Sequence, residues 1–243
     1  MRESPTRNQP IRAIFFDAAG TLFSLQEPVG QTYARIGLRH GVKADAAKLE
    51  TTFRAAWRDL PAPLHPDNQP PADDDRGWWR ELVRRTFAAE SSGMDPSPSE
   101  SLFADLYDHF AQAPAWRLHE DIPVNLRRLS GRFRLFVLSN FDCRLRTILA
   151  GLKISDCFER VILSSEVGAS KPHPRMFQAA LAGCGLPAGA CLHVGDDPRA
   201  DVAGAIAAGL WSFQIQRPAV TLDTLLEKIE SDDFPACIAR NFD

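Results

Sequence analysis

The sequence lacks the features that mark membrane, secreted and nucleic-acid-binding proteins. No apolar run approaches the roughly 18 residues that a membrane-spanning helix needs. Residues 1–10 are polar and lack the hydrophobic segment of a secretory signal. The 28 basic and 31 acidic residues give a net charge of −3, so neither nucleic acid nor a membrane is expected as a partner. The five cysteines form no Cys-x-x-Cys pair, and we predict a reducing, cytoplasmic location.

The apolar run at residues 11–23 is the most informative stretch of the chain. Its strand-forming residues stop at Asp17 and give way to Ala18, Ala19 and Gly20. A continuous apolar run bounded by turn residues is typical of a strand buried on both faces of a parallel sheet. In such sheets ligands bind beyond the carboxyl ends of the strands, where Asp17 would lie, although an aspartate there can also merely cap a turn. The small residues after it leave room for a ligand.

The rest of the chain divides into a helical segment and an alternating α/β segment. A chain of 243 residues can bury a large core or form two domains. Residues 28–113 show helical periodicity, with a proline-rich break. From residue 120, strands alternate with helices, which indicates a parallel sheet covered on both faces. We therefore predict an α/β fold, a doubly wound parallel sheet (residues 1–24 and 115–243) with an inserted α-helical domain (residues 25–114).

Polar residues follow several of the predicted strands, at the edge of the sheet where Asp17 lies. They are Ser139 and Asn140, then Lys171, then Asp196, Asp197 and Asp201. Carboxylate oxygens in this number suit Mg²⁺, which needs few carboxylates and keeps several waters. A lysine with backbone N–H groups suits a phosphoryl group or another oxyanion.

These motifs, taken together and in order, resemble those of the haloacid dehalogenase (HAD) superfamily of hydrolases, in the branch with a helical cap. The matching segments are Asp17-Ala18-Ala19-Gly20-Thr21, Ser139-Asn140, Lys171-Pro172, and Gly195-Asp196-Asp197 with Asp201. The resemblance covers almost the whole sheet domain. It implies a Rossmann-like core and a cap, residues 25–114, that closes over the strand ends and admits small molecules.

The resemblance also implies a role for each matching residue. Asp17 would attack the substrate and form a covalent aspartyl intermediate. Ser139 and Lys171 would hold the oxygens of the transferred group, and Asn140 would support that loop or the substrate. Mg²⁺ would be held by Asp17, the carbonyl of Ala19 and Asp196, with Asp197 or Asp201 acting through water or holding Lys171. In the cap, Arg39 is either a contact for a substrate anion or a surface arginine.

One position departs from the family's phosphatases, which carry a second aspartate two residues after the nucleophile. Here that position is Ala19, and a missing general acid costs about 10²–10⁴-fold in rate. The preferred interpretation is a Mg²⁺-dependent phosphatase acting on a small phosphorylated metabolite, whose leaving group needs little protonation or whose general acid comes from the cap or from a water. The alternatives are a 2-haloacid dehalogenase, a phosphonoacetaldehyde hydrolase with Lys43 or Lys48 as its imine-forming lysine, or an inactive relative that binds a ligand or protein. The protein is expected to be a monomer or a homodimer.

Overall fold

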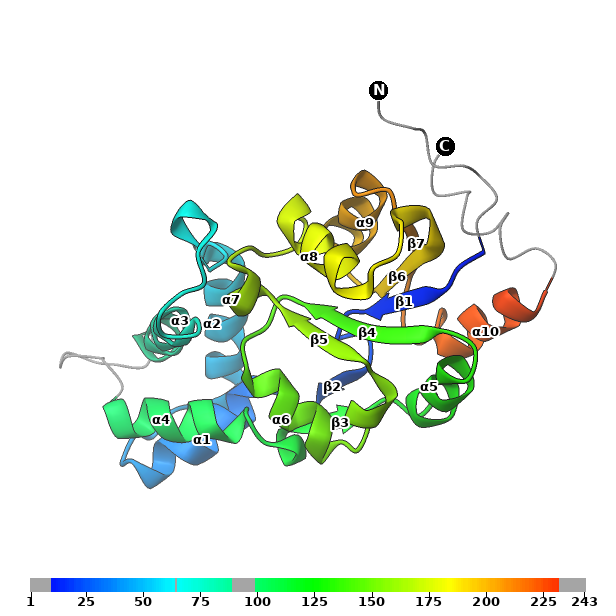
Figure 1. Cartoon of the computed structure of the whole chain (residues 1–243). Helices are drawn as coiled ribbons and strands as arrows, with labels where there is room; N and C mark the ends of the chain where they lie inside the picture. The colour runs from blue at the N-terminus through cyan, green and yellow to red at the C-terminus, as the bar shows by residue number, and fades with distance from the viewer. Residues whose placement is uncertain (1–9, 64, 89–98, 232–243) are drawn as a thin grey trace.

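A five-stranded parallel sheet lies at the centre of the computed structural model, which describes residues 10–63, 65–88 and 99–231 (Figure 1). The strand order is β5-β4-β1-β6-β7. The strands are β1 (Ala13–Phe16), β4 (Arg134–Ser139), β5 (Arg160–Leu163), β6 (Cys191–Gly195) and β7 (Trp211–Gln214). Strand β1, which ends immediately before Asp17, therefore lies in the middle of the sheet, between β4 and β6.

Helices cover both faces of this sheet, because successive side chains of a strand point to opposite faces. Ile14 and Phe16 of β1 pack with α5, α6 and α10, whereas Ala13 and Phe15 pack with α8 and α9. The helices are α5 (Ile122–Ser130), α6 (Arg144–Gly151), α7 (Ser164–Val167), α8 (Pro174–Cys184), α9 (Gly204–Ala207) and α10 (Leu222–Glu230). All four residues of β1 are fully buried, which explains its uninterrupted apolar sequence. The predicted α/β fold is confirmed.

Four further helices form their own apolar cluster beside the sheet. They are α1 (Val29–Arg39), α2 (Ala46–Asp59), α3 (Arg76–Ala88) and α4 (Glu100–His109). Tyr33 and Ile36 on α1, Leu49 on α2 and Phe87 on α3 are buried in this cluster. Helix α1 ends where Gly41 takes a φ of +78°, a conformation that side-chain-bearing residues rarely adopt. These helices follow the periodicity seen in the sequence.

A two-stranded antiparallel sheet joins the helical segment to the parallel sheet. Strand β2 (Phe23–Leu25) pairs with β3 (Trp116–Leu118), so the two connections run side by side. The sequence analysis missed both strands, because three residues are too few to show a period. Strand β2 spans the predicted boundary at residue 24, and β3 begins directly after residue 115; both boundaries stay a prediction. Short helices complete the described chain: η1 (Pro66–Asn68), η2 (Ala113–Ala115), η3 (Ser155–Cys157), η4 (Ala188–Ala190) and the π-helix η5 (Pro198–Ala203).

Side chains also connect the cap helices to the loop after β4. Asp142 accepts hydrogen bonds from the guanidinium of Arg144, at 2.6 and 2.8 Å, and from the indole of Trp79 on α3, at 2.8 Å. The carboxylate of Asp74, just before α3, accepts a hydrogen bond from the backbone N–H of Cys143 at 2.9 Å. Because Asp142 and Arg144 are buried, this connection is shielded from water. It fixes α3 next to the strand-end loops.

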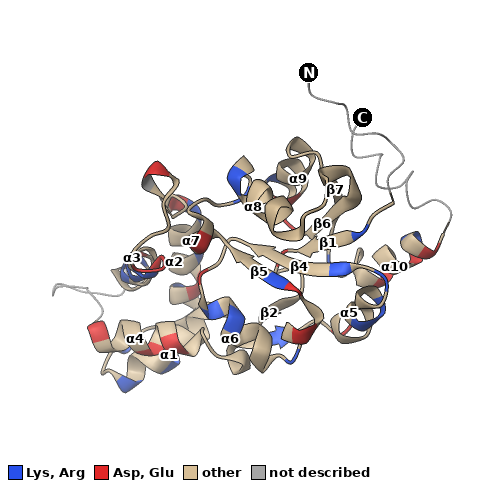
Figure 2. Ribbon diagram, in the orientation of Figure 1, with Lys and Arg blue, Asp and Glu red and all other residues tan. Residues whose placement is uncertain are grey.

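Charged residues of both signs are distributed over the whole ribbon. Figure 2 shows basic and acidic residues interspersed on the cap helices and on the helices that flank the sheet. Among the described residues, no helix is both long and apolar enough to cross a membrane.

Candidate active site

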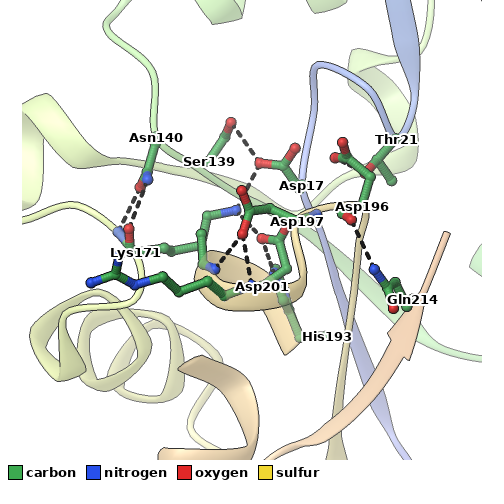
Figure 3. A network of polar contacts seen from close by, with 12 residues as sticks. Asp17, Thr21, Ser139, Asn140, Lys171, His193, Asp196, Asp197, Asp201 and Gln214 are labelled. Carbon is green, nitrogen blue, oxygen red and sulfur yellow. Dashed lines mark hydrogen bonds and ion pairs between the residues drawn. The ribbon is translucent and has the colours of Figure 1, made fainter. Parts of the chain in front are cut away.

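Asp17 lies at the carboxyl end of the central strand, with one carboxylate oxygen engaged and the other open. Its backbone N–H donates to the carbonyl of Val194 at 2.9 Å, which continues the pairing of β1 with β6. The side-chain atom Oδ1 accepts hydrogen bonds from Ser139 Oγ at 3.0 Å and from Lys171 Nζ at 2.7 Å (Figure 3). No described residue donates a hydrogen bond to Oδ2. This oxygen is therefore the one available to a ligand in the cavity that Asp17 lines.

Asn140 fixes the backbone of Lys171 through a reciprocal pair of hydrogen bonds. The amide Nδ2 donates to the Lys171 carbonyl at 3.0 Å, and Oδ1 accepts from the Lys171 N–H at 2.6 Å. Both functional groups of the Asn140 side chain are thus used within the protein. This contact fits one of the two predicted roles, that of supporting the loop.

Asp201 anchors the ammonium group of Lys171. Its Oδ1 accepts from Lys171 Nζ at 2.6 Å and lies 2.8 Å from His193 Nε2, and its Oδ2 accepts from the backbone N–H of Asp197 at 3.0 Å. The approach is close: a Cβ added to Gly195 would lie 2.2 Å from Asp201 Cγ, so only glycine fits there. Both carboxylate oxygens of Asp201 are committed to protein donors.

Asp196 directs its carboxylate toward the loop that follows Asp17. Thr21 Oγ1 donates to its Oδ1 at 3.1 Å, and Gln214 donates to its backbone carbonyl at 3.2 Å. Gly20, with φ of +90°, lies against the carboxylate, because a Cβ there would come within 2.6 Å of Oδ2. Burial, followed by the charges of Asp17 and Asp201, raises the pKa of Asp196 to about 6.

The charges at the site are strongly coupled because the groups are buried together. Burial raises the pKa of Asp17, and the Lys171 ammonium opposes that shift. Burial alone would lower the pKa of Lys171, but the charges of Asp17 and Asp201 raise it above its usual range. Burial would likewise raise the pKa of Asp201, yet Lys171 and the hydrogen bond from His193 hold it well below its ordinary value. Lys171 therefore stays protonated and Asp201 stays ionised.

The donor set fits a divalent cation. One carboxylate oxygen from each of Asp17, Asp196 and Asp201 lies within 4.8 Å of the other two. Burial and then the charges of Asp17 and Asp201 raise the pKa of Asp196, and a bound cation would offset the repulsion between these carboxylates. Hard oxygen donors of this kind are what Mg²⁺ prefers. Because Lys171 and His193 already occupy Asp201, Asp17 and Asp196 are the residues best placed to hold the ion.

A cavity of about 610 Å³ extends from this cluster into the cap. Its polar end is lined by the strand-end residues, including Asp17, Ser139, Lys171 and Asp196. Its other end is lined mainly by aromatic and aliphatic side chains of the cap helices, with Arg54 and Arg144. Ala19 lines the cavity without contributing a proton donor. This volume is in the range typical of sites for small organic ligands.

The structure separates the predicted site residues into two groups. It brings together Asp17, Ser139, Asn140, Lys171, Asp196 and Asp201, with Ala19 beside them. Asp197 lines the cavity, but its Oδ1 caps η5 by accepting from the backbone N–H groups of Arg199 and Ala200. Ala18 is fully buried and packs in the core instead of lining the cavity.

The expectation that Arg39 could contact the substrate needs correction. Arg39 lies exposed at the end of α1 and does not line the cavity. Sequence reasoning chose it by helical spacing from Arg35, but Arg35 pairs with Glu27 on the surface. The arginines that line the cavity are Arg54 and Arg144. The sequence carried no sign of this, because the crossing of the cap helices decides which face meets the site.

The comparisons with known proteins agree with this arrangement. The structure has a parallel α/β core with a carboxylate, a lysine and an acidic turn at its strand ends, and the comparisons place such a chain among the hydrolases. The sequence profile of the haloacid dehalogenase-like hydrolases matches residues 11–209, and the chain belongs to this family. It is 30% identical over 240 residues to haloacid dehalogenase-like hydrolase domain-containing protein 3 of Danio rerio, covering 96% of this chain and 99% of the relative. Both the family and the relative are named as hydrolases.

Solved structures of two kinds share the fold. A HAD phosphatase from Thermococcus onnurineus aligns with a TM-score of 0.64 at 19% identity, over 90% of this chain and 98% of that one. The L-2-haloacid dehalogenase of Xanthobacter autotrophicus aligns with a TM-score of 0.67 at 23% identity, over 91% of this chain and 83% of that one. At these identities the likeness concerns the fold alone, so the reaction has to be argued from the residues of this chain.

Proposed function

We propose that the protein is a Mg²⁺-dependent hydrolase of small phosphate esters that acts through an aspartyl-phosphate on Asp17. The observation that carries this proposal is that the two oxygens of the Asp17 carboxylate have different surroundings. Lys171 and Ser139 engage Oδ1, which orients the carboxylate and leaves Oδ2 open toward the cavity. The same two donors lie where they can contact the oxygens of a transferring phosphoryl group.

The reaction proceeds in two displacements. Asp17 Oδ2 attacks phosphorus, a new P–O bond forms, and the bond to the leaving group breaks with its electron pair on the departing oxygen. Water then attacks the phosphorus of the aspartyl-phosphate, which releases phosphate and restores the Asp17 carboxylate. Asp17 and Asp196 would hold Mg²⁺, which supplies positive charge against the oxygens of the phosphoryl group. Lys171, kept protonated by Asp17 and Asp201, adds a fixed positive charge to the same end of the cavity.

The absence of a carboxyl group at Ala19 restricts the substrates. No side chain at that position can protonate the departing oxygen, so leaving groups that are stable as anions are favoured. The same absence supports a second candidate, a 2-haloacid dehalogenase, because a halide also departs without a proton. A phosphonoacetaldehyde hydrolase is less well supported. The two cap lysines, Lys43 and Lys48, are exposed and do not line the cavity.

Hydrolysis of p-nitrophenyl phosphate and of a panel of phosphorylated metabolites tests the proposal, with Mg²⁺ and with EDTA. We expect turnover that EDTA abolishes and that Asp17→Asn lowers by at least about 10⁴-fold, the scale seen when a nucleophile is removed. Asp156→Asn, on the exposed η3, is the matched control and retains activity. The second candidate, a 2-haloacid dehalogenase, would be established by two results together. The protein would release chloride from 2-chloropropionate in the presence of EDTA, and it would hydrolyse no phosphate ester. No turnover on either substrate class would leave the ligand-binding alternative.

A further inference from the structure

The cap end of the cavity is built as an aromatic wall. Phe53 and Trp57 lie one helical turn apart on α2, with ring centroids 5.9 Å apart, and Trp79 on α3 lies 5.9 Å from Trp57. All three line the cavity that opens from Asp17. We call Phe53, Trp57 and Trp79 the aromatic wall. It faces the space that a leaving group occupies when its phosphoryl group lies at the strand ends.

Two of the tryptophans in this region are fixed by hydrogen bonds, and a third, Trp57, is about half exposed. The indole of Trp79 donates to Asp142 at 2.8 Å, and that of the neighbouring Trp78 donates to the carbonyl of Pro61 at 2.7 Å. Trp57 packs edge-to-face on Trp78 but remains 51% exposed, an unusual exposure for a ring of this size. Trp57 is a large, partly exposed ring that lines the cavity beside the fixed side chains of Trp78 and Trp79. Such a ring is suited to stack on a planar ligand.

The two arginines at this end of the cavity already have partners. Arg144 is paired with Asp142, and its guanidinium lies 3.8 Å from the centre of the Tyr107 ring. Arg54 pairs with Glu50 and is mostly exposed. A leaving group rich in hydroxyls, such as a sugar, would lose its hydration where it lies against the three rings of the wall, because ring faces form no equivalent hydrogen bonds. The wall therefore favours an apolar leaving group.

The chemistry at the other end of the cavity selects among apolar leaving groups. Ala19 provides no proton, so the departing oxygen leaves as an anion. A phenol has a pKa near 10, whereas an aliphatic alcohol is about as weak an acid as water, near 15.7. A phenolate is thus a far better leaving group here than an alkoxide. Stacking on the aromatic wall and the acidity of the leaving group are independent arguments, and both favour an aryl leaving group.

We propose that the substrate is an aryl phosphate monoester whose ring stacks on the aromatic wall. This inference rests on the proposed phosphatase function and adds its substrate class. Asp17 Oδ2 attacks phosphorus, the P–O(aryl) bond breaks, and its electron pair leaves with the phenolate, which takes its proton from solvent. Water then hydrolyses the aspartyl-phosphate and releases inorganic phosphate.

Three substrates separate ring recognition, leaving-group acidity and the phosphatase reaction itself. Acetyl phosphate has an acidic leaving group but no ring, hexyl phosphate is apolar but leaves as an alkoxide, and 1-naphthyl phosphate has both properties. With Mg²⁺ we expect kcat/KM to fall in the order 1-naphthyl, acetyl, hexyl. Trp57→Ala is expected to lower the ratio of kcat/KM for 1-naphthyl over acetyl phosphate about tenfold, the scale of a lost aromatic contact. Leu38→Ala, which is exposed on α1 and outside the cavity, leaves that ratio unchanged.

A binding measurement that needs no turnover of the probe accompanies these rates. Phenylphosphonate is expected to inhibit hydrolysis of acetyl phosphate about tenfold more strongly than methylphosphonate, and Trp57→Ala should remove that difference. Turnover of acetyl phosphate with no preference for the aryl ester, or with a ratio insensitive to Trp57→Ala, overturns the aryl proposal and leaves the phosphatase standing. Hexyl phosphate turned over as fast as 1-naphthyl phosphate also overturns it. No turnover of any phosphate overturns the phosphatase and the aryl proposal together.

Discussion

Lys171 and Asp201 form a buried ion pair, with Nζ 2.6 Å from Oδ1, and the same Nζ lies 2.7 Å from Oδ1 of Asp17. The two side chains are each only 2% exposed. Asp201 receives two further protein contacts, from His193 and from the backbone of Asp197, so its position is determined by the end of β6. Lys171 is thereby held at a fixed distance from the nucleophile.

Asp201→Asn should impair activity without removing a group that touches the substrate. The amide lacks the charge that keeps Lys171 in place, so we expect kcat to fall about 10²-fold, the scale of a misplaced electrostatic group. Steady-state kinetics on acetyl phosphate would measure this. Asp156→Asn, exposed on η3 and outside the cavity, serves as the control. A kcat within twofold of wild type for Asp201→Asn would contradict the positioning role.

Ala19→Asp should restore the missing proton donor. Ala19 is only partly buried and lines the cavity, so the longer side chain has space. We expect kcat/KM for hexyl phosphate to rise by about 10²-fold and that for acetyl phosphate to change little, because only the alkoxide needs protonation. Equal effects on both substrates would show that the aspartate acts in another way than as an acid.

Asp142→Ala should destabilise the contact between α3 and the loop after β4. It leaves the guanidinium of Arg144 buried without its counter-charge and removes the acceptor of the Trp79 indole. The expected loss is about 3–5 kcal/mol, the cost of leaving one partner of a buried pair alone. Thermal unfolding followed by circular dichroism measures it, with the exposed Asp156→Ala as the control. A Tm within one degree of the control would refute this account of the contact.

The ion pair between Asp121 and Arg217 should make the folding stability of the protein depend on pH in the acidic range. Burial would raise the pKa of Asp121, but the guanidinium of Arg217 and the backbone N–H of Leu222 outweigh it and lower that pKa. A lowered pKa in the folded state means that the contribution is complete above the unfolded value, about 3.9, and is lost as the pH falls through the lower folded value. Asp121→Asn should therefore lower the urea midpoint at pH 6, and the difference from wild type should shrink below about pH 4. A difference that is constant from pH 6 to pH 3 would contradict this assignment.

Arg217 connects the same pair to the active-site loop, which adds a functional readout. Its Nη2 donates to the backbone carbonyl of Thr21 at 2.9 Å, and Thr21 in turn holds Asp196. We expect Arg217→Lys to raise the Mg²⁺ concentration needed for half-maximal activity severalfold, because a point charge cannot keep both contacts. Arg199→Lys, exposed on η5, is the control. An unchanged Mg²⁺ requirement would show that the loop does not depend on Arg217.

The sequence by itself determined the fold class and the strand-end residues. The run at 13–16 had to be buried on both faces because it contains no polar residue, and the alternation after residue 120 fixed a parallel sheet. Once the strands were parallel, Asp17, Ser139 and Asp196 had to meet at one edge, since each directly follows or ends a strand. Local patterns were enough because these residues are placed by the register of adjacent strands.

Tertiary structure alone decided the rest. The crossing of the cap helices placed Trp57 and Arg54 in the cavity and left Arg39 outside, although all three lie on helices of similar pattern. The choice between Asp197 and Asp201 as partner of Lys171 depended on the π-helix η5, in which Asp201 turns back toward β6 while Asp197 caps the first turn. Periodicity records which face of a helix is apolar. The neighbour that covers that face is determined only when the whole chain packs.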